Sequence, residues 1–439
     1  MKKYYPLFIL HFAFFILTSC SIEKQISKSA TAIVLRDSSL TTAHVGISFY
    51  EPATNRYWYN YNGDHYFVPA SNTKIPTCYA AMKYLGDSLV GLKYVKNDSG
   101  YLLQGAGDPS FLLSEFSNQP VLSFFKRIGP NNDLVFSVDN WKERHLGSGW
   151  AWNDYNESYM AERSAFPVYG NVARFTAAND KIKSFPSMFD STIILMPGVR
   201  PDSMEMERVM DENIFLVRPA KTVFSDAVIP YRTFGYSTAV QLLNDTLIFT
   251  KPIKETIIPF PRTMARNIYS QPTDSLLKPM MHRSDNFFAE QALLMVSNER
   301  LGTMSDEKII DTLLKTDLKD LPQKPRWADG SGLSRYNLFT PQDFVFILNK
   351  MKSEFAMERI KVILPTGNEG TLDGRFVADS NYIFAKTGTL SGVVALSGFL
   401  YTKKNRLLIF SVLVNNHNAS ASSIRRAVER FIQNVRKRY

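Results

Sequence analysis

The sequence Ser-Asn-Thr-Lys at residues 71–74 begins a predicted helix, because apolar residues follow at helical spacing over residues 75–85 until Gly86. Ser71 and Lys74 are three positions apart, so a helix places both side chains on one face, with the amine able to reach the hydroxyl. A serine hydroxyl is a poor nucleophile at neutral pH. A lysine activates it only where burial or a neighbouring cation lowers the pKa of the amine. Taken alone, such a pair is in most proteins a helix-capping serine and a solvated lysine.

The sequence near both chain ends predicts one layered domain. Residues 44–50 and 56–61 alternate as two strands joined by a turn, and residues 33–35 are also β-like. Helices are predicted at 283–301, 305–314 and 340–351, the last with Thr340 and Asp343 as a capping box. The chain then gives strands at 382–386, 394–401 and 407–415 and a basic helix from near Ser422. We therefore expect an α+β fold whose antiparallel sheet comes from both chain ends and is flanked by helices.

The middle of the chain has a different sequence pattern. Short apolar stretches, such as residues 192–196, 214–217 and 246–250, are separated by Pro, Asn, Asp and Gly, with no internal repeat and no low-complexity tract. These features predict one or two folded β-rich modules rather than a spacer. The expected division is residues 21–95 plus 260–439 as the main domain, with residues 96–259 inserted.

Two further motifs follow the first in order, Ser284-Asp285-Asn286 and Lys386-Thr387-Gly388-Thr389. Each alone has a plain explanation, since the former can be a helix cap and the latter a sheet-edge lysine before a turn. Together the three motifs resemble the serine penicillin-recognising enzymes, whose signature is S-x-x-K, S-x-N and K-T-G. The resemblance implies a DD-peptidase/β-lactamase-like fold, which agrees with the sheet and helices predicted above.

The long separation between the first two motifs narrows the choice of family that the chain resembles. Ser284 lies 213 positions after Ser71, and low-molecular-mass class C penicillin-binding proteins insert additional domains at this place. The chain therefore most resembles that D-alanyl-D-alanine carboxypeptidase/endopeptidase family. The similarity covers nearly the whole mature chain and includes four other stretches, at residues 105–110, 149–154, 329–334 and 364–367.

The resemblance implies a catalytic role for Ser71, Lys74 and Ser284 and a substrate-binding role for Asn286. Ser71 would attack the carbonyl between the two terminal D-alanines of a peptidoglycan stem peptide and hold the acyl group as an ester. Lys74 would be the base, its pKa lowered by the nearby charge of Lys386. Ser284 would hydrogen-bond both lysines and relay a proton to the leaving amine, and Asn286 would hold Lys74 and the substrate amide.

The resemblance also implies how the substrate is bound. Lys386, Thr387 and Thr389 would bind the terminal carboxylate. Gly388 would provide clearance where the substrate lies against the strand. The backbone N–H groups of Ser71 and Thr389 would form the oxyanion hole. The implied covalent inhibitors are β-lactams, and no metal or cofactor is expected.

Some residues near the motifs have structural explanations. Pro76 would cost about 3 kcal/mol in a helix interior, but less if Asn72 caps the helix; the placement of Lys74 depends on this point. We expect Cys78 to be a buried thiol, Asp285 to be structural, and His282 to serve packing because no G-x-S-x-G elbow accompanies it.

Two alternative functions remain. A serine β-lactamase would share the acylation residues, but the chain has no E-x-x-L-N segment, and its second motif begins with Ser rather than Tyr. A non-catalytic, peptidoglycan-binding envelope lipoprotein is the other alternative. Relatives without activity usually lose a motif residue, whereas this chain keeps all seven polar ones.

The first 20 residues predict export. Lys2 and Lys3 precede an apolar run over residues 6–17, too short to span a bilayer, and the segment ends Leu-Thr-Ser-Cys at Cys20. This end resembles a bacterial lipobox, so we expect a signal peptide, a lipidated Cys20 and attachment to a membrane in the cell envelope or at the periplasmic face.

Composition and motifs exclude several other classes. The chain of 439 residues has 51 Lys+Arg and 41 Asp+Glu, 45% hydrophobic residues and two cysteines, which is ordinary globular composition without a disulfide framework. No zinc-binding spacing and no phosphate-binding glycine loop is present. We interpret the basic C-terminal helix as a solvated face rather than a nucleic-acid site.

Overall fold

A five-stranded antiparallel sheet joins the two ends of the chain in the order β14-β15-β16-β1-β2. Its strands are β1 (His44–Glu51), β2 (Arg56–Tyr61), β14 (Ile383–Leu390), β15 (Val393–Tyr401) and β16 (Leu407–Asn415). β1 pairs with β16, with Ile47 opposite Val412. The structure is a computed structural model that describes residues 22–178, 181–199, 201–220 and 224–439. The predicted α+β fold with a sheet of both chain ends is confirmed.

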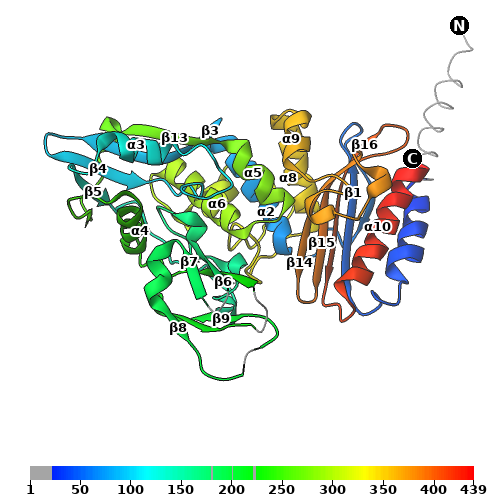
Figure 1. Cartoon of the computed structure of the whole chain (residues 1–439). Coiled ribbons are helices and arrows are strands. Elements are labelled where there is room, and N and C mark those ends of the chain that lie inside the picture. The colour runs from blue at the N-terminus through cyan, green and yellow to red at the C-terminus, as the bar shows by residue number, and fades with distance from the viewer. Residues whose placement is uncertain (1–21, 179–180, 200, 221–223) are drawn as a thin grey trace, which may run out of the picture.

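Helices cover both faces of this sheet (Figure 1). Leu408, Phe410 and Val412 of β16 share a buried cluster with α10 (Ala421–Arg438), whereas Ile409 and Leu413 belong to the cluster on the opposite face. This alternation follows from the two-residue period of a strand. On the opposite face α8 (Pro341–Glu354) packs against β1, β15 and β16. The buried cluster on this face continues into α2 (Lys74–Tyr84), α5 (Thr273–His282), α6 (Asn286–Leu301), α7 (Asp306–Lys315) and α9 (Met357–Ile363).

Helix boundaries explain two sequence features. Thr340 and Asp343 form the predicted capping box at the start of α8. The helix predicted at 283–301 begins only at Asn286, because Ser284 has a positive φ of 63° and Asp285 caps α6 by accepting a hydrogen bond from the backbone N–H of Phe288. The structural role expected for Asp285 is thus a helix cap.

Pro76 lies in the first turn of α2. The short helix η2 (Ala70–Thr73) leads directly into α2, whose cap is Thr73 rather than Asn72. The N–H groups of the first turn have no acceptor within the helix, so a proline at this position removes no helical hydrogen bond. The sequence of residues 70–76 therefore holds Lys74 at the first helical position without a penalty from Pro76.

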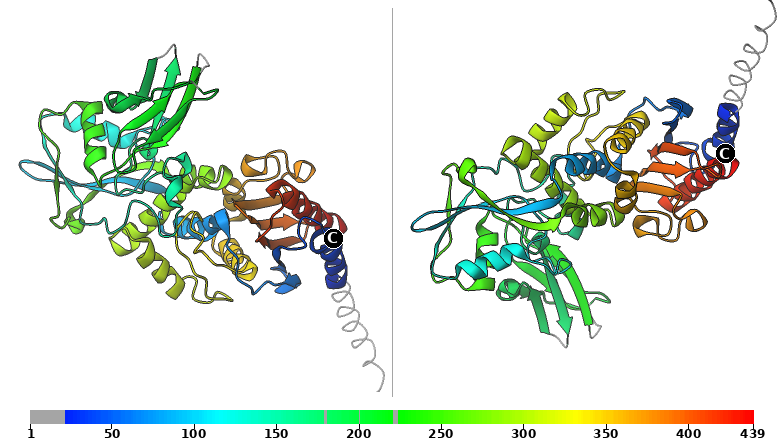
Figure 2. Two further views of the ribbon diagram at one scale, coloured as in Figure 1. Left: turned by 90° about the horizontal axis from the view of Figure 1, so that it is seen from below. Right: turned by 90° about the horizontal axis from the view of Figure 1, so that it is seen from above.

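The prediction of a strand at residues 33–35 was wrong. Residues 22–30 are helical, and η1 (Thr31–Leu35) continues them. Ile26, Ala30 and Val34 recur every four residues and are buried in the cluster formed with α10, beside which this helix lies (Figure 2). A three-residue window is too short to distinguish this helical period from strand alternation.

The residues between α2 and α5 form three further sheets. One has the order β12-β5-β4-β3-β13 and the others β11-β6-β7 and β8-β10-β9. Their bounds are β3 (Ser88–Lys96), β4 (Gly100–Gly105), β5 (Asp133–Ser137), β6 (Val172–Ala178), β7 (Lys181–Phe185), β8 (Ile193–Leu195), β9 (Glu205–Arg208), β10 (Phe215–Arg218), β11 (Phe224–Pro230), β12 (Lys254–Thr256) and β13 (Arg266–Pro272). The first sheet extends past the predicted limits at 95 and 260, because β3 begins at Ser88 and its partner β13 ends at Pro272.

These sheets enclose a core of their own. Phe136, Phe175 and Phe215 are fully buried there, together with residues of α3 (Pro120–Ile128) and α4 (Ser237–Leu247). Figure 1 shows this region at the far side of the helices from α10. Besides η2, the described residues form the 3₁₀ helices η3 (Trp152–Asp154), η4 (Ser158–Met160), η5 (Tyr169–Asn171), η6 (Ser187–Thr192), η7 (Arg262–Met264), η8 (Gly370–Leu372) and η9 (Val377–Asp379).

The predicted signal segment at residues 1–20, with Cys20, lies outside the described residues. Among the helices that are described, none is both long and apolar enough to cross a membrane.

The contact between α10 and the sheet gives a test of the fold. Phe431 of α10 is fully buried, and its ring centroid lies 5.6 Å from that of Phe49 in β1. We expect Phe431→Ala to lower the free energy of unfolding by about 3–5 kcal/mol, because it removes buried area and leaves a cavity. Urea unfolding followed by circular dichroism measures the change. The exposed neighbour Arg426→Ala is the control, and equal midpoints for the two variants would contradict this packing.

Candidate active site

Ser71 and Lys74 face each other at the start of α2. Lys74 Nζ lies 3.0 Å from Ser71 Oγ. The turn into η2 places Ala70 at a φ of 47°, in the left-handed region that non-glycine residues seldom occupy. Lys74 is completely buried, whereas Ser71 is partly accessible. The hydroxyl is thus available to a substrate while the amine behind it is kept from water.

The Lys74 amine also contacts two other polar atoms besides Ser71 Oγ. These are Asn286 Oδ1 at 2.6 Å and the Ser331 carbonyl oxygen at 2.8 Å. A neutral amine has two N–H donors and one lone pair. If the donors point to Asn286 and Ser331, which can only accept through these atoms, the lone pair is directed at Ser71. The arrangement can therefore accept a proton from the Ser71 hydroxyl.

Burial favours the neutral form of this amine. It lowers the pKa of Lys74 to about 8, while the charges of Asp329, Asp285 and Glu290 act in the opposite direction. Burial also lowers the pKa of Lys386, and the charge of Lys74 lowers it further. We expected the charge of Lys386 to lower the pKa of Lys74, whereas in the structure burial is the main cause of the lowered pKa.

Ser284 contacts the second lysine. Its Oγ accepts a hydrogen bond of 2.9 Å from Lys386 Nζ, which also donates to the Thr387 carbonyl oxygen at 2.8 Å. We expected Ser284 to bond both lysines, but Lys74 donates to Asn286 and Ser331. Asn286 meanwhile donates through Nδ2 to the Tyr159 carbonyl oxygen at 3.1 Å.

Gly388 permits β14 to approach the turn that holds Ser71. A Cβ atom at residue 388 would lie 2.7 Å from the Pro69 carbonyl oxygen and 3.1 Å from the Ser71 backbone nitrogen. We expected a side chain at residue 388 to clash with the substrate. In the structure it would clash first with the chain's own backbone. This close approach brings the Ser71 N–H beside residues 388–389, where an oxyanion hole with the N–H of Thr389 was expected.

Two threonine partners were missed by the sequence analysis. Thr387 Oγ1 lies 2.7 Å from Thr371 Oγ1, and Thr389 Oγ1 accepts a hydrogen bond of 2.7 Å from the Arg425 guanidinium. Arg425 was counted in the solvated face of the terminal helix. That interpretation was wrong for Arg436, which is buried and pairs with Asp379 at 3.3 Å, whereas Arg425 is partly exposed.

The loop of residues 329–334 supplies the Ser331 carbonyl and is held by buried hydrogen bonds. The Asp329 carboxylate accepts from the backbone N–H groups of Gly332 and Ser334 at 2.8 and 2.6 Å, and from Trp150 Nε1 at 3.0 Å. Residues 149–154 and 329–334, each recognised only as a family-like stretch, thus meet through Trp150 and Asp329.

Two nearby residues stand apart from this chemistry. Cys78 is a buried free thiol, and burial raises its pKa to about 12. His282 Nε2 lies 3.3 Å from the Val362 carbonyl oxygen, and burial lowers its imidazole pKa. Both fit the packing roles expected for them.

A sheet of both chain ends that places an S-x-x-K, an S-x-N and a K-T-G motif together is typical of serine penicillin-recognising enzymes. The sequence profile of the D-Ala-D-Ala carboxypeptidase 3 (S13) family matches residues 27–195 and 240–435. The chain therefore belongs to this family and is a serine-type D-Ala-D-Ala carboxypeptidase.

Individual relatives agree with this assignment. The chain is 26% identical to the D-alanyl-D-alanine carboxypeptidase DacB of Haemophilus influenzae over an alignment of 422 positions that covers 82% of each chain. It is 24% identical to the D-alanyl-D-alanine carboxypeptidase of Actinomadura sp. strain R39 over an alignment of 439 positions that covers 88% of this chain and 80% of the relative. The crystal structure of penicillin binding protein 4 (dacB) from Haemophilus influenzae superposes with a TM-score of 0.73 at 20% identity, covering 93% and 98% of the two chains. The predicted membership of the class C penicillin-binding proteins is confirmed.

The buried amine predicts a pH dependence. Acylation of Ser71 requires neutral Lys74, so the rate of acylation by benzylpenicillin should rise with pH to a plateau, with a midpoint near the amine pKa of about 8. Stopped-flow or quenched mass measurements between pH 6 and 10 give the profile.

Lys74→Arg is the matched variant, because a guanidinium stays protonated over this range. We expect it to acylate about 10²–10⁴-fold more slowly at every pH. A pH-independent rate for the parent protein would show that Lys74 is not the base.

Proposed function

We propose that Ser71 is the nucleophile that removes the terminal D-alanine from peptidoglycan stem peptides. Its oxygen forms a bond with the carbonyl carbon between the two D-alanines while its proton passes to Lys74. The C–N bond then breaks, and the leaving amine takes a proton that Ser284 passes on from Lys386. Water attacks the ester carbonyl and gives one proton back to Lys386 through Ser284. The ester C–O bond breaks, and Lys74 returns its proton to Ser71 Oγ, which restores the hydroxyl.

The observation that favours this function most is the geometry of Lys74. Its amine lies 3.0 Å from Ser71 Oγ, is buried, and has its other two directions occupied by Asn286 and Ser331. A lysine that merely accompanied a helix cap would be solvated and would keep its ordinary pKa. The geometry therefore supports a base rather than the capping pair.

The substrate would be bound along β14. Thr387 and Thr389 would hydrogen-bond the terminal carboxylate, Lys386 would add positive charge from behind Ser284, and the backbone N–H groups of Ser71 and Thr389 would stabilise the oxyanion. Asn286 would also contact the substrate amide. The Arg425 guanidinium, 2.7 Å from Thr389 Oγ1, is a further cation that would favour a carboxylate here.

We further propose that β-lactams acylate Ser71, since they present a strained amide to the same groups. The penicillin binding protein 4 of Haemophilus influenzae has been crystallised with a β-lactam, and its fold matches this chain with a TM-score of 0.68. The alternative of a dedicated β-lactamase requires fast hydrolysis of the acyl-enzyme. Rapid turnover of benzylpenicillin, in place of a long-lived adduct on Ser71, would favour that alternative.

The location and the domain division are proposals as well. Residues 1–20 support export and a lipid anchor on Cys20, at the periplasmic face or elsewhere in the envelope. Such an anchor would hold the enzyme near its cell-wall substrate. The pairing of β3 with β13 supports an insertion spanning about residues 88–272 rather than 96–259.

Purified muropeptides test the function directly. Incubation with monomeric pentapeptide muropeptides should release one D-alanine per peptide, measured by mass spectrometry. Cross-linked dimers in a parallel reaction show whether the enzyme is also an endopeptidase. Ser71→Ala removes only the hydroxyl and should abolish both reactions.

An absence of product from the folded parent protein would contradict the proposed activity. If the same protein also failed to label with a fluorescent penicillin, the non-catalytic, peptidoglycan-binding alternative would be favoured.

Arg425 gives a separate prediction on substrate binding. Arg425→Gln should raise KM for a peptide ending in a free carboxylate about tenfold, roughly 1.4 kcal/mol, and change kcat less, because it removes a charge beside the carboxylate rather than a reacting group. Arg426→Gln, the exposed neighbour on α10, is the control. If both variants had the parent KM, Arg425 would have no part in recognition.

A further inference from the structure

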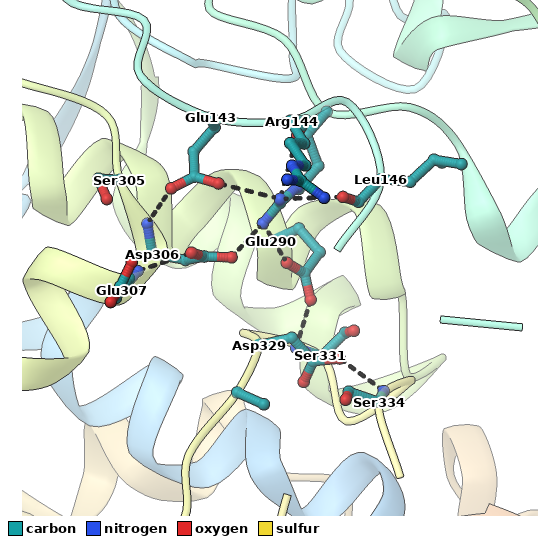
Figure 3. Close-up of polar contacts among 12 residues, drawn as sticks. Glu143, Arg144, Leu146, Glu290, Ser305, Asp306, Glu307, Asp329, Ser331 and Ser334 are labelled. Atoms are coloured by element: carbon teal, nitrogen blue, oxygen red, sulfur yellow. Dashed lines mark hydrogen bonds and ion pairs between the residues drawn. The ribbon is translucent and has the colours of Figure 1, made fainter. Parts of the chain in front are cut away.

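Ser331, whose carbonyl oxygen accepts from Lys74, is itself held through its backbone N–H by a buried carboxylate. Glu290 of α6 is 1% exposed, and its Oε1 accepts a hydrogen bond of 2.7 Å from the Ser331 backbone N–H. The carbonyl oxygen of the same residue accepts from Lys74 Nζ at 2.8 Å. A displacement of Glu290 would therefore move the acceptor that orients the amine (Figure 3).

Arg163 holds Glu290 in place. Its buried guanidinium lies 3.3 Å from Glu290 Oε2, 2.5 Å from Asp306 Oδ2 and 3.2 Å from Glu143 Oε2. It also donates to the Arg144 carbonyl oxygen at 3.0 Å. Figure 3 shows Glu143, Asp306 and Glu290 arranged around these contacts. One planar cation thus fixes three carboxylates in a region closed to water.

The inserted region supplies this support. Arg163 lies in the connection between β5 and β6, as do Trp150, which donates to Asp329, and Tyr159, whose carbonyl oxygen accepts from Asn286. Three contacts from one connection therefore reach three groups around the Lys74 amine.

The charges around the Lys74 amine make the Arg163 guanidinium important. Lys74 faces the carboxylates of Asp285, Glu290 and Asp329 and lies near the second amine, Lys386. Burial and the charge of Asp329 raise the pKa of Glu290 to about 8, and Arg163 opposes that rise. Without the guanidinium, the buried carboxylates of Glu290 and Asp306 and the half-buried carboxylate of Glu143 would lose the Arg163 charge that offsets their mutual repulsion.

We propose that Arg163 is a positioning residue for the acylation step. It fixes Glu290, Glu290 fixes the Ser331 carbonyl, and that carbonyl directs the lone pair of Lys74 at Ser71. The proposal rests on the function proposed above, and it gives the inserted region a part in catalysis. The arrangement does not include the groups expected to bind the substrate carboxylate, Thr387, Thr389 and Arg425.

The proposal separates acylation from initial binding. Arg163→Met should lower the acylation rate constant for benzylpenicillin about 10- to 100-fold, because a displacement of about 1 Å at a reacting group can cost as much as 10²-fold. The dissociation constant of the initial complex should stay within about twofold of the parent value. Arg163→Lys keeps a charge but not the planar fork, so an intermediate rate is expected.

A matched control separates positioning from general stability. Arg436→Met removes another buried arginine, paired with Asp379 between α10 and η9, and should leave the acylation rate constant unchanged. Both variants are measured below their melting temperatures. An acylation rate constant for Arg163→Met equal to that of the parent would overturn the proposal.

Trp150→Phe decides the question if Arg163→Met does not fold. It removes the N–H that binds Asp329 and replaces the indole ring, whose centroid lies 5.6 Å from the Arg163 guanidinium, by a smaller ring. We expect it to lower the acylation rate constant by less than Arg163→Met does. An unchanged rate constant would then overturn the proposal. In either experiment, a parent protein that forms no adduct on Ser71 would instead contradict the proposed function.

Discussion

The site depends on one constraint, which is that a lysine amine is buried beside a serine hydroxyl. Water would solvate the ammonium and hold its pKa near the ordinary value, where almost no neutral amine exists at pH 7. Burial lowers the pKa of Lys74 to about 8, and the carboxylates of Asp329, Asp285 and Glu290 limit the fall. A moderate shift suits a group that must accept a proton and later release it.

This burial is possible only because remote segments of the chain meet. Ser71 lies in η2, the Asn286 amide begins α6, and the Ser331 carbonyl comes from a loop that leads to α8. The central sheet brings β14 against the same turn, where Gly388 leaves room for the backbone of Ser71. Both chain ends contribute strands to that sheet, so the fold and the site form together.

The sequence predicted the reacting residues better than the residues that surround and support them. The spacing of Ser71 and Lys74 at a helix start predicted that these two side chains face each other. That Asn286 joins them was implied by the resemblance of the three motifs to one enzyme family. Arg163 and Glu290 are 127 positions apart, and no local pattern connects a buried arginine with a carboxylate at that distance. Arg425 was not predicted to contact the site because a basic residue near the end of a chain is usually solvated.

Local conformation was also beyond the sequence. Ser284 adopts a positive φ that no propensity predicts for serine, and this ends one helix before the next begins at Asn286. The glycine at residue 388 was correctly singled out, but its reason came from a contact with Pro69, more than 300 positions away. Tertiary contacts of this kind decide details that periodicity leaves open.

Titration of the Lys74 amine itself tests the central claim most directly. The protein can be labelled with lysine that carries ¹³C at Cε, and the Lys74 signal is assigned by its absence from Lys74→Met. The account predicts a midpoint near pH 8 for this signal, well below the signals of the exposed lysines. A midpoint near the ordinary value of about 10.4 would mean that the amine is a solvated cation and would contradict its role as the base.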